Sequence, residues 1–283
     1  MTQLTIETVD QWVDDVLWRH AGRLDLSRVD VVDPYALLVI AVTARQFQKE
    51  RQGQTLPLEW PRNDCVRAWL NAMGLPHYLG RTPVQSADVD LQSMVAQPMT
   101  PIDTEEHIRQ IVEAFDRRLA VRYPLTEESR RGLVRAMFEL FQNIPQHANA
   151  TGNAPDVLGL AAMQELPDRQ QFMLAVADDG IGLQGSLSMR ASYSGLTHAQ
   201  ALSEILFRGV SRHADPGRGG ELRRIARLAK TWDGTLVIRS GNAVLYMDSE
   251  RGDVYEAPLL PGVQIALSIP QYVLGVESEP ELA

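Results

Sequence analysis

Three polar residues recur every four positions in an otherwise apolar stretch of the chain. Glu139, Asn143 and His147 lie within residues 133–148, which read LVRAMFELFQNIPQHA. In a helix, this spacing places the three side chains on one face. The intervening residues are mostly apolar, so we expect a buried helix, in which an unpaired neutral polar group costs roughly 2–7 kcal/mol. The stretch therefore predicts a site that holds a metal ion or another polar partner, and the alternative is a polar stripe facing solvent.

Two glycine-rich turns follow this helix in the chain. Residues 172–183, FMLAVADDGIGL, predict an apolar strand that ends in the turn DDGIG, and residues 216–222, PGRGGEL, predict a turn that opens a helix. Taken alone, an Asp-Gly pair after a strand is an ordinary turn about as often as it is part of a site. The ordered set of three motifs is more specific than any one of them.

In this order, the motifs E-x-x-x-N, D-x-G-x-G and G-x-G resemble the Bergerat-fold ATP-binding module of the GHKL superfamily, which includes gyrase, Hsp90, histidine kinases and MutL. The resemblance covers residues 102–275 and implies an α/β sandwich, a mixed sheet with helices on one face, that binds Mg²⁺ with ATP or ADP. By the same resemblance, Asn143 is the Mg²⁺ ligand and contacts the nucleotide, and Glu139 is the general base. The chemistry fits, because an amide oxygen is a hard ligand for Mg²⁺ and a carboxylate one turn away can reach a nucleophile near the γ-phosphate.

The resemblance also implies the contacts to the rest of the nucleotide. Asp178 would accept a hydrogen bond from the adenine amino group, and Gly180 and Gly182 would let the backbone approach the base. The phosphates would be bound by the glycine-rich turn, and residues 183–218 resemble the mobile lid over the nucleotide. The residues assigned to the phosphates are Gly217, Arg218, Gly219 and Gly220.

Local charge agrees with an anionic ligand at this turn. Between Arg208 and Lys230 there are seven basic residues against two acidic ones, a net charge of +5 in a chain whose net charge is −9. A glycine-rich turn at a helix N-terminus combines amide donors, the helix dipole and guanidinium groups. The alternative is the solvated face of an ordinary surface helix.

Two positions depart from the family pattern. Glu221 replaces the third glycine of the phosphate turn and brings a carboxylate beside it, which we expect to lower affinity or favour ADP. Val263 follows Gly262 where the family usually has a threonine, so one hydroxyl beside Asp178 is missing.

Residues 1–80 read as a short strand, helix, strand and helix, and resemble the α/β STAS domain of anti-sigma factor antagonists. Asp33 stands at the strand-to-helix turn, but Pro34, Tyr35 and Ala36 follow where that family presents a phosphorylated hydroxyl. Proline suits the first turn of a helix, and Tyr35 begins an apolar run, so we expect it to pack. We therefore predict a docking or dimerisation module, not a substrate for phosphorylation.

Composition limits the number of domains, the kinds of partner and the compartment that we expect. The 283 residues are 45% hydrophobic, which indicates a folded chain of one large or two ordinary domains. Residues 81–101 are predicted to connect two domains, and residues 276–283 to form an acidic tail. The negative charge argues against a nucleic-acid partner and against an anionic membrane. One cysteine, Cys65, and no apolar run of spanning length predict a cytoplasmic protein.

The function expected from these patterns is that of an Mg·ATP-binding regulatory protein with slow hydrolysis or Ser/Thr phosphoryl transfer, as in anti-sigma-factor kinases. The alternative is a nucleotide-switched regulator of protein interactions without turnover. Glu139 favours chemistry, whereas Glu221 and Val263 favour a relaxed site. The expected partners are the nucleotide, a STAS-type or other signalling protein, and a second copy of the chain.

Overall fold

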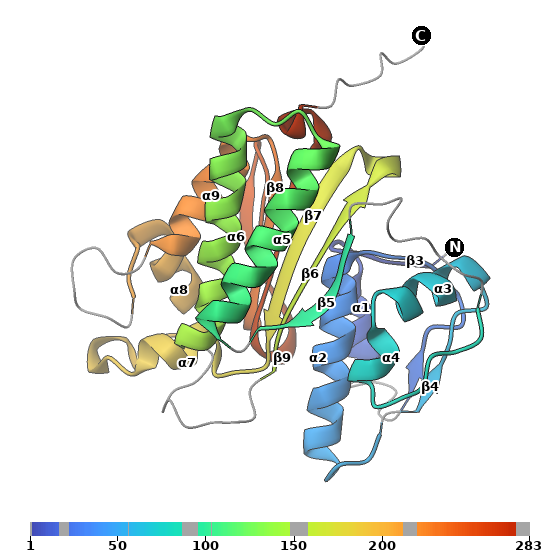
Figure 1. The fold of residues 1–283 in the computed structure, drawn as a ribbon. Helices are drawn as coiled ribbons and strands as arrows, with labels where there is room; N and C mark the ends of the chain where they lie inside the picture. The colour runs from blue at the N-terminus through green and yellow to red at the C-terminus, as the bar shows by residue number, and fades with distance from the viewer. Residues whose placement is uncertain are drawn as a thin grey trace.

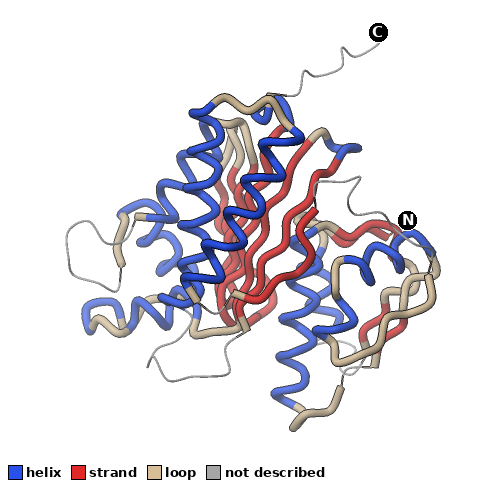
Figure 2. Tube along the Cα trace, in the orientation of Figure 1, coloured by secondary structure: helices blue, strands red, loops and turns tan. Residues whose placement is uncertain are grey.

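The computed structural model describes residues 2–16, 23–55, 57–86, 96–102, 104–147, 158–211 and 220–275. Within these residues the chain forms a five-stranded antiparallel sheet with helices on both faces and two small parallel sheets near the N-terminus (Figures 1 and 2). The mixed α/β class expected from the sequence is confirmed.

The described residues of the N-terminal part form four short strands and four helices. β1 pairs in parallel with β3, and β2 pairs in parallel with β4. The predicted strand, helix, strand and helix correspond to β1, α1, β3 and α2, whereas β2 and α4 are elements that the sequence did not predict. The elements are β1 (Thr2–Leu4), α1 (Val9–Asp14), β2 (Leu24–Asp25), β3 (Val29–Val32), α2 (Pro34–Glu50), β4 (Leu58–Glu59), α3 (Asp64–Ala72) and α4 (Leu75–Tyr78).

Helix α2 begins where the sequence predicts. The Asp33 carboxylate caps it by accepting a hydrogen bond from the Ala36 N–H at 2.8 Å, and it also accepts one from the Ile6 N–H at 2.7 Å. Pro34 occupies the first turn, where its missing N–H has no cost. Tyr35 is 1% exposed, which confirms that it is a packing residue.

The large sheet has the strand order β5-β6-β7-β9-β8. Every neighbouring pair in it is antiparallel, so the expectation of a mixed sheet is wrong. The physical reason is that strands running in the same direction are never neighbours: β6 separates β5 from β7, and β9 separates β7 from β8. The strands are β5 (Ala96–Pro101), β6 (Gly159–Leu166), β7 (Gln171–Asp178), β8 (Thr235–Met247) and β9 (Gly252–Pro270).

Helices cover both faces of this sheet. On one face, Leu174 and Val176 of β7 pack in a core with helices α5 (Glu105–Arg122), α6 (Glu127–His147) and α9 (Glu221–Thr231). This is the single helical layer that the sequence predicts.

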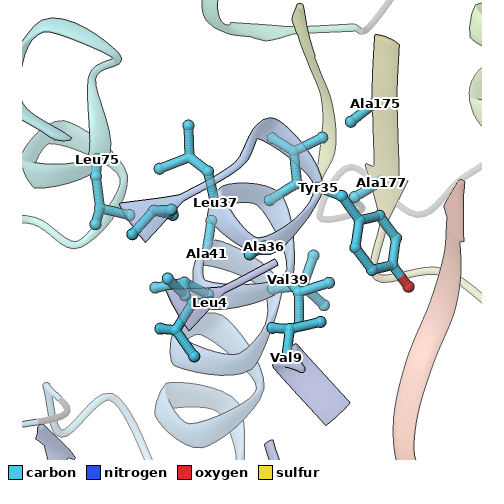
Figure 3. Close-up of a cluster of buried hydrophobic side chains, with 14 of the residues drawn as sticks. Leu4, Val9, Tyr35, Ala36, Leu37, Val39, Ala41, Leu75, Ala175 and Ala177 are labelled. Atoms are coloured by element: carbon cyan, nitrogen blue, oxygen red, sulfur yellow. The ribbon is translucent and has the colours of Figure 1, made fainter. Parts of the chain in front are cut away.

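The other face is covered by α2 from the N-terminal part. Ala175 and Ala177 of β7 belong to the same core as Tyr35, Ala36 and other α2 residues, and Figure 3 draws these side chains together. Alternate residues of a strand point to opposite faces, so the alanines of β7 all face α2, and their small side chains allow close packing. The sequence prediction of helices on one face did not include this second layer.

The stretch predicted as an interdomain connection is not irregular throughout. Residues 96–101 form β5, the edge strand of the large sheet, paired with β6. Residues 87–95 and the predicted acidic tail lie outside the described residues. The predicted domain boundaries stay predictions.

The stretch between β7 and α9 forms short helices. The sequence predicts a helix from Thr197 to Phe207, and α8 (His198–Ser203) continues into a π-helical turn at Glu204–Arg208, with Thr197 as its N-cap. A helix that the sequence did not predict, α7 (Gly182–Ser188), precedes it. Among the described residues, no helix combines the length and apolar character needed to cross a membrane.

Candidate functional site

Helix α6 carries the first motif and is buried as predicted. Thr126 caps it, since its Oγ1 accepts a hydrogen bond from the Ser129 N–H at 3.1 Å. Met137 and Phe141 are fully buried on its apolar side. The helix continues two residues past Pro145 and ends at His147, whose side chain lies outside the described residues.

Asn143 and the start of α9 line a common cavity. The Asn143 amide group donates a hydrogen bond from Nδ2 to the Glu139 backbone carbonyl at 2.9 Å. The cavity has a volume of about 40 Å³ and is lined by Asn143, by α7 residues such as Ser186, and by Gly220 and Glu221. Gly220 has a φ of +96°, a conformation that favours glycine, and directly precedes α9. The structure thus brings the first and third motifs together, while Gly217, Arg218 and Gly219 lie outside the described residues.

Asp178 ends β7, and only 4% of it is exposed. Its Oδ1 accepts a hydrogen bond from the Gly180 N–H at 2.8 Å, and the Val263 N–H donates another to the carboxyl group. Burial raises the pKa of Asp178 to about 7; the two N–H groups oppose this increase, and the neighbouring Asp179 adds to it. Val263 therefore contributes a backbone donor where the family pattern has a side-chain hydroxyl.

Two glycines near the end of β7 allow close approaches of the backbone. A Cβ atom at Gly262, whose φ is +79°, would lie 2.6 Å from Asp178 Oδ1. A Cβ atom at Gly182, whose φ is +70°, would lie 2.9 Å from the Ser240 hydroxyl oxygen. That hydroxyl accepts a hydrogen bond from the Leu183 N–H at 2.8 Å and so fixes the start of α7. Any side chain at either glycine would displace these groups.

The glycines of the second motif line a different cavity from Asn143. Gly180, Gly182 and Gly262 line a cavity of about 210 Å³, together with His198 and the end of α2. Helix α7 starts at Gly182 and also lines the cavity of Asn143, so it connects the two.

Glu139 lies on a third hollow, a groove of about 480 Å³ between α6 and α9. Its Oε1 lies 2.9 Å from Arg135 Nε and 3.0 Å from Arg224 Nε. The Arg224 guanidinium also lies 3.5 Å from Glu221 Oε1. The carboxylate predicted as a general base is thus engaged by two cations, and the charge of Glu221 is offset by Arg224.

Sequence reasoning missed a cluster beside the second motif. The buried Asp179 carboxylate accepts hydrogen bonds from Arg45 Nε and Lys49 Nζ of α2, both at 2.7 Å, and from the Leu158 N–H at 2.7 Å. The sequence does contain a signal for this cluster. Arg45 and Lys49 are four residues apart and share a helix face, and Asp179 must point away from Asp178 at the end of a strand.

Comparisons with known proteins give no further information on this site. No protein-family model matches the chain, and no curated protein matches it.

Proposed function

We propose that this protein binds a purine nucleotide, ATP or ADP with Mg²⁺, and that binding regulates its contact with a protein partner. The observation that carries the proposal is the environment of Asp178. Its buried carboxyl group lies at the end of a strand and faces Gly262. Helix α7 follows it in the chain and lines the cavity that also contains Asn143 and Gly220. A buried acceptor of this kind suits the exocyclic amino group of adenine.

The hydrogen bond of the Asn143 amide supports its proposed role, because it leaves the amide oxygen for Mg²⁺. A backbone carbonyl only accepts hydrogen bonds, so the Nδ2 end of the amide is committed to the Glu139 carbonyl. The oxygen is then the end left for a cation. Bound Mg²⁺ would neutralise phosphate oxygens, and Asn143 would hold it from the side of α6.

In the present conformation, the cavity beside Asn143 is too small for a nucleotide. A cavity of about 40 Å³ holds a water molecule and not a nucleotide. Binding therefore requires the segment from α7 to α8 to move away from α6. Motion of a covering segment on binding is common in nucleotide enzymes.

The ion pairs of Glu139 favour a function in which the protein binds the nucleotide but does not turn it over. A general base must be within reach of the proton that it removes, and this carboxylate is instead held between Arg135 and Arg224. We therefore place a nucleotide-switched interaction regulator ahead of an anti-sigma-factor-kinase-like enzyme, with a STAS-type protein or a second copy of the chain as the partner.

Calorimetric titration with ATP, ADP and a non-hydrolysable analogue, with and without Mg²⁺, tests binding. Asp178→Asn should weaken binding under all conditions, whereas Asn143→Ala should weaken it with Mg²⁺ and have little effect in EDTA. Asp253→Asn, at an exposed site on β9, is the matched control and should bind as the wild type does. Unchanged binding of Mg·ATP by both site variants would refute the proposal.

Turnover is tested separately with Glu139→Ala. If Glu139 is a general base, the variant keeps its affinity for ATP and loses hydrolysis or transfer by roughly 10²–10⁴-fold. The switch candidate predicts the same negligible turnover in the wild type, in Glu139→Ala and in the exposed control Glu128→Ala.

A further inference from the structure

Helices α6 and α9 lie side by side over the large sheet (Figure 1), and a groove of about 480 Å³ runs between them. We call it the α6–α9 groove. Two of its lining residues, Glu139 and Glu221, belong to the candidate nucleotide site. Most of the other lining residues are apolar or basic, and they have no role in that site.

Two apolar side chains line the groove next to each other. Val134 and Phe138 are one turn apart on α6, and both are half-buried. Their spacing of four residues places them on the same side of the helix. A half-buried aromatic ring still exposes part of its apolar surface, and aromatic residues are frequent anchors at protein interfaces. The groove therefore offers an apolar strip that a partner can cover.

Three arginines line the same groove. Arg131 and Arg135 are one turn apart on α6, with 78% and 71% of their side chains exposed, and Arg224 comes from α9. Arg135 Nε and Arg224 Nε lie 2.9 and 3.0 Å from the same oxygen of Glu139, so these two guanidinium groups are neighbours. The Glu139 side chain is only 13% exposed. A ligand that approaches from solvent therefore meets the arginines first.

The other carboxylates at the groove compete only weakly for these arginines. Arg131 pairs with Glu127 at 2.9 Å, and both side chains are largely exposed. Arg224 lies 3.5 Å from Glu221 Oε1. Exposed ion pairs contribute only about 0–1 kcal/mol, so they can be exchanged for pairs with a ligand.

Charge and length define the ligand that fits the groove. Because the chain as a whole has a net charge of −9, its mean potential repels an acidic ligand, and the arginine cluster is a local exception. The lining extends along α6 from Arg131 to Gln142, about 16 Å along the helix axis or three helical turns. The groove between two adjacent helices is a natural packing site for a third helix.

We propose that the α6–α9 groove is the docking site for the protein partner of the nucleotide switch, and that this partner presents an acidic amphipathic helix of about three turns. Apolar side chains of the partner helix cover Val134 and Phe138, and its carboxylates pair with Arg131, Arg135 and Arg224. The assignment to the partner of the switch rests on the function proposed above, whereas docking of an acidic helix in the groove does not require a nucleotide.

Glu221 links the groove to the nucleotide site. It lines both the groove and the cavity of Asn143, and Arg224 lies beside it. Phosphates bound in that cavity would attract the Arg224 guanidinium, since charge-assisted hydrogen bonds to phosphate are strong. Arg224 would then be withdrawn from the groove, so nucleotide binding should weaken docking of the acidic helix.

The docking site is tested with a fluorescein-labelled peptide of about four helical turns, in which leucines at helical spacing are separated by glutamates. Fluorescence anisotropy measures its binding to the full-length protein without nucleotide. We expect saturable binding that added salt weakens. Matched peptides with glutamine or lysine in place of glutamate should bind at least about tenfold more weakly, because they lose several ion pairs. A peptide with serine in place of leucine should also bind more weakly, because it cannot cover the apolar strip.

Protein variants place the binding in the groove. The double variant Arg131→Gln/Arg135→Gln removes two exposed charges and keeps the side-chain length, so it should fold and bind the glutamate peptide about tenfold more weakly. Circular dichroism checks the fold. The matched control is Arg109→Gln on α5, an exposed arginine that pairs with Glu106 and does not line the groove. It should bind the peptide as the wild type does.

Three results would overturn the docking site: no saturable binding of the glutamate peptide, equal binding of the glutamine or lysine peptide, or an equal loss in Arg109→Gln. Self-association of the protein that is lost in the double variant would also overturn it, by identifying a second copy of the chain as the occupant.

A second titration, at a saturating concentration of Mg·ATP, tests the link to the nucleotide. We expect the glutamate peptide to bind at least about threefold more weakly, the effect of losing one exposed ion pair. Unchanged affinity while calorimetry shows bound nucleotide would overturn the assignment to the switch. If calorimetry shows no nucleotide binding, the function proposed above fails, and docking of an acidic helix is judged from the titration without nucleotide.

Discussion

Two adjacent carboxylates at the end of β7 have opposite surroundings. Asp178 lies in the layer of the sheet that faces α6, and its partners there are backbone N–H groups. Asp179 lies on the side of α2, where Arg45 and Lys49 neutralise it. The alternation of side chains along a strand is enough to separate them. As a result, burial raises the pKa of Asp178 to about 7, well above its ordinary value of 3.8.

This raised pKa makes the stability of the protein depend on pH in a defined direction. Between pH 4 and 7 the folded protein retains the Asp178 proton and the unfolded chain has lost it, so the folded state binds more protons. Raising the pH through this range therefore lowers the contribution of Asp178 to stability, by about 1.4 kcal/mol per pH unit at most. Below pH 4 the contribution is constant.

Asp178→Asn isolates this effect, because the amide cannot ionise. We expect the free energy of unfolding of the variant, relative to that of the wild type, to increase from pH 4.5 to pH 7. Urea unfolding of both proteins at several pH values measures the difference. A difference that is the same at every pH would show that Asp178 is not protonated in the folded state.

Gly262 has a backbone conformation that favours glycine, and it lies against Asp178. Its φ of +79° and the position of Asp178 Oδ1 at 2.6 Å from a Cβ atom both oppose any side chain. We predict that Gly262→Ala lowers the free energy of unfolding by at least about 2 kcal/mol, from strain and displacement of Asp178. Gly195→Ala is the control, because a Cβ atom there has no heavy atom within 4 Å. Equal melting temperatures for the two variants would contradict the prediction.

At the scale of elements, α2 is attached to the sheet by packing and by charge. Its apolar side packs on the alanines of β7, and Arg45 and Lys49 reach Asp179, whose other oxygen binds the Leu158 N–H. Asp179 is thus the common partner of α2, β7 and the segment before β6. A movement of α2 would therefore act on Asp179, the residue next to Asp178.

Removing the Asp179 carboxylate should lower the free energy of unfolding more than removing an exposed carboxylate does. Asp179→Ala removes the carboxylate that Arg45 and Lys49 share and leaves the Leu158 N–H without this acceptor, so we expect a loss of about 2–4 kcal/mol in the free energy of unfolding. Chemical denaturation measures it. The matched control is Glu127→Ala, which removes the exposed pairs of α6 with Arg130 and Arg131 and should change stability by less than about 1 kcal/mol. Similar losses in both variants would show that the cluster of Asp179, Arg45 and Lys49 has no special role in stability.

At the scale of the whole molecule, the N-terminal part and the sheet share one core. Residues from β1, α2 and α4 are in the same buried cluster as residues of β6, β7 and β9. A second link comes from Arg239 of β8, which is fully buried and donates to the Asp10 carboxylate of α1 and to the Pro258 carbonyl. Burial lowers the pKa of Arg239 to about 10, which still leaves it charged at neutral pH.

We therefore predict one cooperative unfolding transition for the whole chain. Calorimetry should give a van't Hoff enthalpy close to the calorimetric enthalpy, and circular dichroism and tryptophan fluorescence should give coincident transitions. Residues 96–283 alone should fail to fold stably, because the alanine-rich face of the sheet would lose α2. Two separate transitions, or a stable fragment, would instead support two independent domains.

Much of the architecture follows from local patterns in the sequence. The start of α2 at Pro34, the burial of α6 and the strand that ends at Asp178 depend on caps, on apolar spacing and on turn residues that lie within a few positions of each other. For the same reason, the sequence alone identified Glu139, Asn143, Asp178 and the glycines as candidates for chemistry, since each belongs to a short motif.

Only the tertiary structure decided which strands are neighbours, what covers the second face of the sheet, and what Glu139 binds. Strand order depends on the path of the chain between elements, and no local pattern indicates that β9 would lie between β7 and β8. The pairs Glu139–Arg224 and Asp179–Arg45 join residues that are far apart in the chain. Such pairs form because packing brings two surfaces together, and charge then selects among the side chains that already lie within reach.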